Sequence, residues 1–127
     1  MARTRLAGFS LSLSLALLAG SSCRPKENAV WASIHPGPGE SLPSILERET
    51  GKAARKSLMP VVYIGATWDM TSTAIKQSRR DPLMHDALQG TYVIELNIDD
   101  WGEQDLEPLG FKAGVVPYFY IVDGGGR

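Results

Sequence analysis

The sequence predicts one mixed α/β domain built around a parallel pair of strands. Two short, largely apolar runs, 59–66 and 91–98, flank a stretch with helix-starting signals, and a third run, 118–122, lies nearer the C-terminus. Continuous runs rich in β-branched residues are typical of strands buried on both faces. A strand, a helical crossover and a second strand favour a parallel pair with a right-handed connection.

The first helix of the domain is predicted over residues 42–57. Ser41 can cap its start, and Gly51 weakens its interior by about 1 kcal/mol relative to alanine. Its apolar residues recur at helical spacing, which predicts one buried face: Leu42, Ile45, Leu46 and Ala53.

Further helices are predicted where acidic side chains can cap free backbone N–H groups. Asp69 can cap a helix that runs to about residue 80. Asp81 can cap a second helical piece, with Pro82 at its first position and Gly90 after its end. After the strand at 91–98, a short helix is predicted over 103–109.

The turn after the strand at 59–66 resembles the active-site turn of the thioredoxins. In that family an apolar strand runs into Ala-x-Trp-Cys-x-x-Cys, and the second half of the motif opens a helix. This chain reads Ala66-Thr67-Trp68-Asp69-Met70-Thr71-Ser72. The resemblance places Asp69 at the nucleophilic cysteine and Ser72 at the resolving one, so positions 68–72 are a degenerate active site. Neither side chain can exchange disulfides.

Two further segments resemble the same family, in its order and at its spacing. Residues 96–99 are similar to its matching strand, and residues 109–117 to the approach to its cis-proline. The resemblance covers about residues 60–124. It implies a thioredoxin-like three-layer α/β/α sandwich with strands in the order 92–98, 61–66, 118–122. The family's last strand and helix are not present, so we expect a C-terminally incomplete domain over residues 41–127.

Residues 1–22 are typical of a bacterial lipoprotein signal. Arg3 and Arg5 precede an apolar run too short for a membrane span, and small residues lead to Cys23, the chain's only cysteine. The arrangement resembles signals in which this cysteine becomes the lipidated first residue. The alternative is an ordinary secretory signal with a chance cysteine. We expect a lipid anchor at Cys23 that holds the protein on the extracytoplasmic side of the bacterial cell envelope.

Residues 23–40 have the composition of a flexible tether, because they combine prolines and glycines with mixed charge. Within them, Trp31-Ala32-Ser33-Ile34 is expected to dock on the domain as a short extended piece.

Charge and motif spacing argue against several classes of function. The chain has 13 basic and 14 acidic residues, and loss of Arg3 and Arg5 with the signal leaves a net charge of −3, which disfavours nucleic acid as a partner. His35 and His85 lie too far apart for a metal-binding motif. No glycine loop that could hold a phosphate precedes a helix. We therefore expect no metal and no cofactor.

One binding feature of the family is expected to persist without thiols. The residue before the cis-proline pairs through its backbone with an extended peptide, and Val116-Pro117 matches that position. Trp68 and Met70 would flank the groove. The alternative is that Pro117 serves only the geometry of the turn. The predicted function is therefore binding of a peptide or envelope protein, or assembly. An oxidoreductase whose thiols come from a partner or from further C-terminal sequence, and a remnant without specific activity, are the alternatives.

Overall fold

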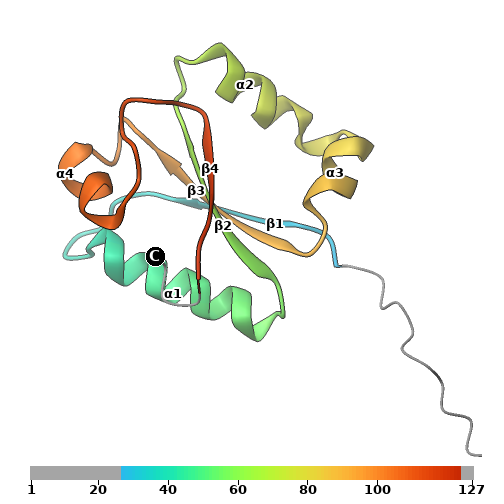
Figure 1. Cartoon of the computed structure of the whole chain (residues 1–127), viewed down its shortest axis with the longest axis horizontal. Coiled ribbons are helices and arrows are strands. Elements are labelled where there is room, and N and C mark those ends of the chain that lie inside the picture. Colours follow the sequence, from blue (N-terminus) through green and yellow to red (C-terminus); the bar gives the residue numbers. More distant parts are fainter. Residues whose placement is uncertain (1–26, 124–127) are drawn as a thin grey trace, which may run out of the picture.

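The computed structural model describes residues 27–123, which form a mixed α/β domain around a four-stranded sheet (Figure 1). The order in the sheet is β1-β3-β2-β4. Strand β3 is parallel to both of its neighbours, and β4 is antiparallel to β2. The mixed α/β class, the parallel pair and the order of the three predicted strands are confirmed. The strands are β1 (Val30–Ile34), β2 (Met59–Gly65), β3 (Thr91–Asn97) and β4 (Tyr118–Ile121).

Helices cover both faces of the sheet, with α1 and α4 on one side and α2 and α3 on the other (Figure 1). The predicted helix at 70–80 is divided, because its last three residues form a 3-10 turn before Asp81 caps α3 through the backbone N–H of Leu83. A second 3-10 turn, Glu107–Leu109, follows α4. The α-helices are α1 (Leu42–Arg55), α2 (Met70–Gln77), α3 (Pro82–Leu88) and α4 (Glu103–Leu106).

The N-terminal part of the sheet corrects the predicted boundary of the tether. Residues Val30–Ile34, inside the segment 23–40, form β1 and pair with β3 along their whole length, from Val30 opposite Tyr92 to Ile34 opposite Leu96. The expected docking of this extended piece is therefore confirmed, but the folded domain begins before residue 41. The signal at 1–22, the anchor at Cys23 and residues 124–127 lie outside the described residues.

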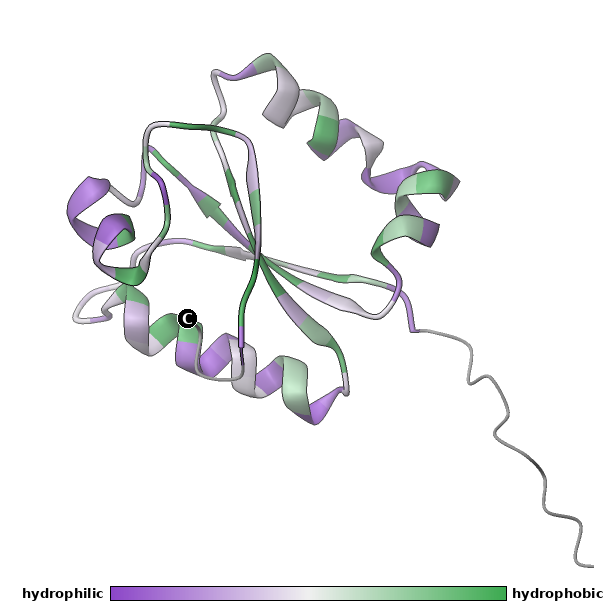
Figure 2. Cartoon of the chain, viewed as in Figure 1, coloured by the Kyte–Doolittle hydropathy of each residue, from purple (hydrophilic) through white to green (hydrophobic). Residues whose placement is uncertain are grey.

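The main hydrophobic core lies between α1 and one face of the sheet. Alternate residues of β2 and β3 point to this face, including Val62, Ile64 and Ile94, and all three are fully buried. They pack with the apolar stripe predicted on α1: Leu42, Ile45, Leu46 and Ala53. Figure 2 shows green apolar segments along the strands, and apolar segments that alternate with hydrophilic ones along the helices. Burial of this stripe fixes α1 against the sheet.

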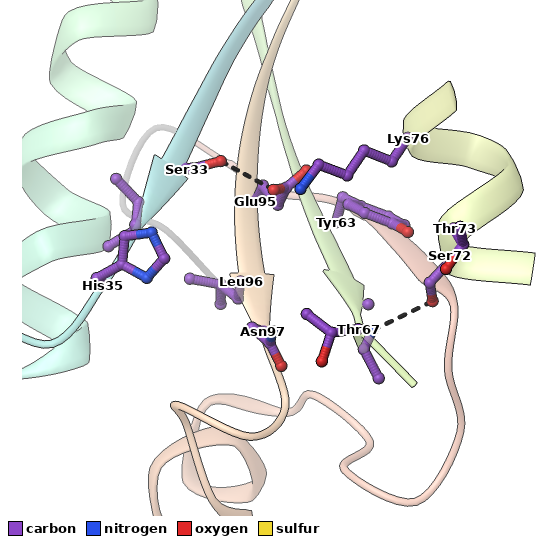
Figure 3. Close-up of a pocket in the computed structure, with 13 residues that line it drawn as sticks. Ser33, His35, Tyr63, Thr67, Ser72, Thr73, Lys76, Glu95, Leu96 and Asn97 are labelled. Atoms are coloured by element: carbon purple, nitrogen blue, oxygen red, sulfur yellow. Dashed lines mark hydrogen bonds between the residues drawn. The ribbon is translucent and has the colours of Figure 1, made fainter. Parts of the chain in front are cut away.

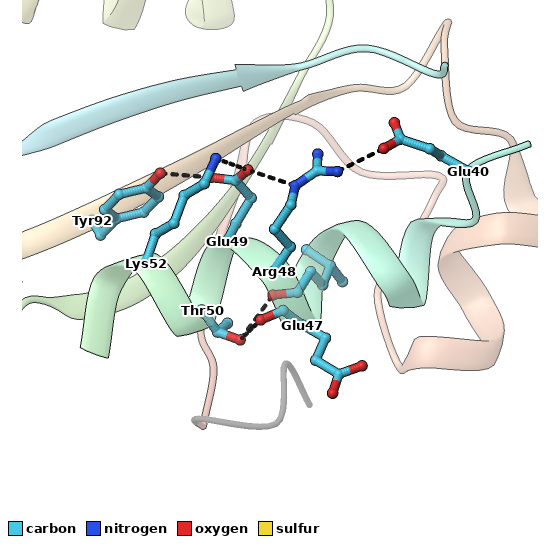
Figure 4. A network of polar contacts seen from close by, with 8 residues as sticks. Glu40, Glu47, Arg48, Glu49, Thr50, Lys52 and Tyr92 are labelled. Carbon is cyan, nitrogen blue, oxygen red and sulfur yellow. Dashed lines mark hydrogen bonds and ion pairs between the residues drawn. The ribbon is translucent and has the colours of Figure 1, made fainter. Parts of the chain in front are cut away.

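The core on the α1 side contains one buried acid, Glu49, which is 2 % exposed. The Tyr92 hydroxyl donates to its Oε2 at 2.6 Å and Lys52 Nζ to its Oε1 at 2.9 Å (Figure 4). Arg48 lies 3.4 Å from the same oxygen and pairs with Glu40 at 2.6 Å. These contacts make the buried charge tolerable and join α1 to β3.

The opposite face of the sheet carries aromatic and charged residues beside the buried Val61 and Val93. The Arg79 guanidinium lies 4.2 Å from the centre of the Trp31 ring and forms an ion pair with Glu95. Burial lowers the pKa of Arg79. The Tyr63 ring packs edge-on against Trp31, with ring centres 6.1 Å apart, and at a tilt against Phe119, with ring centres 4.7 Å apart. Helices α2 and α3 cover this face loosely, because Ser72 is the only buried residue in the two helices.

Candidate site at the end of strand β2

The turn from β2 into α2 is closed by the side chains of Asp69 and Ser72. Asp69 is the N-cap of α2, and its Oδ2 accepts a hydrogen bond from the backbone N–H of Ser72 at 2.6 Å. The buried Ser72 hydroxyl accepts from the backbone N–H of Ala66 at 3.2 Å. Thr73 adds a bond from its hydroxyl to the Asp69 carbonyl at 3.0 Å. Both polar groups therefore hold the backbone of the turn, as expected for a helix cap.

Two large apolar side chains of this turn face solvent. Trp68 is 67 % exposed and Met70 is 87 % exposed. The indole N–H of Trp68 donates to Asp99 Oδ1 at 3.1 Å, and Asp99 follows the end of β3. This bond fixes the orientation of the exposed ring. Thr71 is also exposed. An exposed aromatic held in one orientation costs little entropy to bury in a complex.

The segment before β4 lies at the same end of the sheet as the turn. Tyr118 is opposite Ile64 in the antiparallel pair, so Val116-Pro117 come next to the end of β2, where the turn to Trp68 begins. The Val116–Pro117 peptide bond is cis, as predicted. The Val116 side chain packs against the core, whereas Val115 is half exposed. Within residues 27–123, no backbone hydrogen bond of Val116 is found outside the helices and strands.

A cavity of about 410 Å³ lies behind the turn, between α2 and the carboxyl ends of the three parallel strands (Figure 3). Its lining combines apolar surface with polar side chains, which include Ser33, Tyr63, Ser72, Lys76, Glu95 and Asn97. The sequence interpretation did not identify this cavity. The residue that could have indicated the cavity is Tyr63, a tyrosine in a buried strand whose neighbours Val62 and Ile64 face the main core.

Within residues 27–123, no group of three or more His, Cys, Asp or Glu side chains could hold a metal ion. His35 pairs with Asp100 at 3.0 Å, whereas His85 is an exposed residue of α3. Among the helices of the described residues, none is long and apolar enough to cross a membrane.

Comparison of the chain with protein-family models, with curated proteins and with solved structures finds no match.

Proposed function

We propose that this chain is a membrane-tethered, thioredoxin-like domain without redox cysteines that binds an extended peptide. The peptide lies at the end of β2, beside the turn that carries Trp68 and the segment Val116-Pro117. The strand order β1-β3-β2-β4 and the helix that opens within the Trp68–Ser72 turn support the thioredoxin-like assignment.

Two features at one end of the sheet support the proposal together. One is an exposed aromatic ring held in a fixed orientation, and the other is a backbone segment that the described loops and turns do not hydrogen-bond. Asp99 holds the exposed ring of Trp68. Val116 lies at the same end of the sheet, and its backbone is not engaged by the described loops and turns. An extended peptide satisfies both features, because its backbone pairs with Val116 while one of its side chains packs on Trp68.

The polar side chains of the turn also support a binding function, because they already form hydrogen bonds within the protein. The Asp69 carboxylate and the Ser72 hydroxyl both hold backbone N–H groups. A nucleophile or general base must instead be free to reach the reacting atoms of a substrate. Binding without covalent chemistry is therefore the function that this turn supports best.

Selection and titration of peptides test the proposal. A displayed library of random linear peptides is selected on the full-length protein in detergent, and the affinity of the enriched peptide is measured by calorimetry. Trp68→Ala should weaken binding about tenfold or more, as is typical when a central aromatic is truncated.

The matched control is Leu83→Ala, because Leu83 on α3 is also a large exposed apolar residue, 79 % exposed, away from the turn. This variant should bind the peptide with unchanged affinity. Equal losses in the two variants, or no enriched peptide at all, would contradict the proposed site.

The tether is tested separately from the peptide site. Acylation of Cys23 after removal of residues 1–22 would hold the domain on a membrane of the cell envelope. Mass spectrometry of the N-terminal peptide should find an acylated cysteine, and Cys23→Ser should release the protein into the soluble fraction. An unmodified Cys23 in the mature protein would refute the lipid anchor.

A further inference from the structure

We propose that the cavity behind the turn binds a small organic monocarboxylate. This site goes beyond the proposed peptide surface and does not depend on it, because the cavity lies between α2 and the sheet, whereas the peptide would lie on the exposed ring of Trp68.

The position and size of the cavity are those of a ligand site. It lies at the carboxyl ends of β1, β3 and β2, where ligands bind in open α/β sheets, and α2 forms its other wall. Its volume of about 410 Å³ falls in the usual range for small-molecule pockets. A carboxylate group alone would not fill this volume, so the ligand carries a further body.

One charge of the cavity wall has no ionic partner. Lys76 extends from α2 toward the side of the cavity where Glu95 lies (Figure 3), and no ion pair of Lys76 is found among residues 27–123. The Glu95 carboxylate already pairs with Arg79, and His35 at the end of β1 pairs with Asp100 at 3.0 Å. The unbalanced charge of the lining is therefore positive, which favours a ligand with one negative charge.

The polar atoms of the wall that can accept hydrogen bonds are already occupied by the protein. Glu95 Oε1 accepts from the Ser33 hydroxyl at 2.8 Å. Asn97 Oδ1 accepts from the backbone N–H of Asp99 at 2.9 Å, and Ser72 Oγ accepts a backbone N–H at 3.2 Å. A cationic ligand, which can only donate, would find few free acceptors here.

The donors of the wall, in contrast, are largely free. Because Asn97 Oδ1 is held by Asp99, the Nδ2 atom of the same amide keeps both of its N–H groups for a ligand. Among the described residues, the hydrogen of the Ser72 hydroxyl is used in no bond, and the Thr67 hydroxyl forms none. A carboxylate accepts hydrogen bonds only, so it matches these donors and pairs with the ammonium group of Lys76.

Gly65 leaves the Ser72 hydroxyl open to the cavity. It lies in the same wall, and a Cβ atom at this position would lie 3.2 Å from Ser72 Oγ. Any other residue would place a side chain beside this donor. The Tyr63 hydroxyl is not one of the ligand's donors, because it is fully buried in the wall.

The rest of the lining suits a compact apolar body with no second charge. Ile34, Ala66 and Leu96 contribute to the wall together with Tyr63, so apolar atoms of the ligand would leave water on binding. The Glu95 carboxylate lies in the same wall and would repel a second negative charge. A monocarboxylate is therefore favoured over a dicarboxylate and over inorganic phosphate.

The experiment is an NMR titration of the full-length protein in detergent. The probes are acetate, butyrate, benzoate and phenylacetate, each compared with its neutral amide, and inorganic phosphate. Benzoate or phenylacetate should give saturable shifts at the amides of Ser72, Lys76 and Asn97. Its amide should bind about tenfold more weakly, because the amide has no charge to pair with Lys76.

Three results of this titration would overturn the proposal. They are the absence of a saturable shift with every monocarboxylate, equal affinity of a carboxylate and its amide, and tighter binding of inorganic phosphate than of any monocarboxylate.

Two variants with matched controls locate the site. Lys76→Met should weaken binding about tenfold, whereas Lys56→Met at the C-cap of α1 should not change it. Asn97→Asp keeps an oxygen for the N–H of Asp99 but replaces the donor with a charged oxygen, so it should also weaken binding. Gln104→Glu adds the same charge on α4, across the sheet, and should leave the affinity unchanged. Unchanged affinity in both Lys76→Met and Asn97→Asp would place the carboxylate elsewhere and reject this cavity.

Discussion

The carboxylate of Asp69 accepts a hydrogen bond from the backbone N–H of Ser72 at 2.6 Å, and these are the two residues that stand at the cysteine positions of the resembled motif. Asp69 is thereby the N-cap of α2. An acidic side chain at this position satisfies a free N–H group and suits the positive end of the helix.

We expect Asp69→Ala to lower the free energy of unfolding by about 1 kcal/mol, the usual cost of losing an N-cap. Asp69→Asn keeps an oxygen that can accept from Ser72 and should retain most of this stability. Urea unfolding followed by circular dichroism measures both. If Asp69→Asn lost as much free energy of unfolding as Asp69→Ala, the charge of Asp69, and not its hydrogen bond, would stabilise the turn.

The wild-type protein is expected not to reduce disulfides, because Asp69 and Ser72 cannot form or resolve a mixed disulfide. The assay is insulin reduction with dithiothreitol as electron donor. The double variant Asp69→Cys/Ser72→Cys should gain turnover if the turn is thioredoxin-like, since one thiol would then lie at a helix N-terminus. Turnover by the wild type above the rate without protein would contradict the proposed loss of redox activity.

Tyr63→Phe should raise the free energy of unfolding by about 1 kcal/mol in the absence of ligand, because it removes a buried hydroxyl that has no partner. A purely structural role of the hydroxyl predicts the opposite sign. Thermal unfolding of Tyr63→Phe, with Tyr118→Phe as the control on β4, measures this difference.

The buried Glu49 makes stability depend on pH. Burial raises the pKa of this carboxyl, but hydrogen bonds from Tyr92 and Lys52 outweigh burial and hold it below its ordinary value of 4.5. The folded state therefore favours the charged form. This contribution is present above about pH 4.5 and is lost as pH falls through the lower pKa of the folded state.

We expect unfolding in urea to show that the wild type loses stability below about pH 4.5. In Glu49→Gln, much of this dependence of stability on pH should disappear. Glu47→Gln on the same helix is the matched control, because Glu47 is exposed. An identical pH profile in Glu49→Gln and the wild type would show that the network does not contribute in this way.

The same network also predicts a loss of stability in alkali. Burial and the bond to Glu49 raise the pKa of Tyr92 to about 12, so the folded state disfavours ionisation of this hydroxyl. Stability is therefore retained below the ordinary pKa of 10.0 and falls as pH rises toward 12.

Local signals in the sequence were sufficient to predict most of the helices and strands. Asp81 followed by Pro82 predicted the start of α3, and the Asp69 cap predicted the start of α2. The end of α1 is two residues earlier than predicted, because Lys56 is its C-cap and Ser57 adopts a left-handed conformation with φ 55°. The local sequence around Ser57 does not indicate this conformation.

Features that depend on distant parts of the chain could not be predicted in this way. The residues of β1 lie among prolines and glycines, and their strand character comes from pairing with β3, with Trp31 opposite Val93. The cavity needs side chains from three strands and from α2. Whether the Tyr63 hydroxyl finds a hydrogen-bond partner depends on the positions of Ser72 and Phe119. No local pattern in the sequence predicts these positions.

The most direct measurement of the central proposal is amide hydrogen exchange of the full-length protein with and without the selected peptide. If the peptide pairs with the backbone before Pro117, exchange at the Val116 N–H should slow about tenfold or more at saturation, and exchange in α3 around Leu83 should not change. Protection confined to β4 at Ile121, with no change at Val116, would contradict peptide binding at this site.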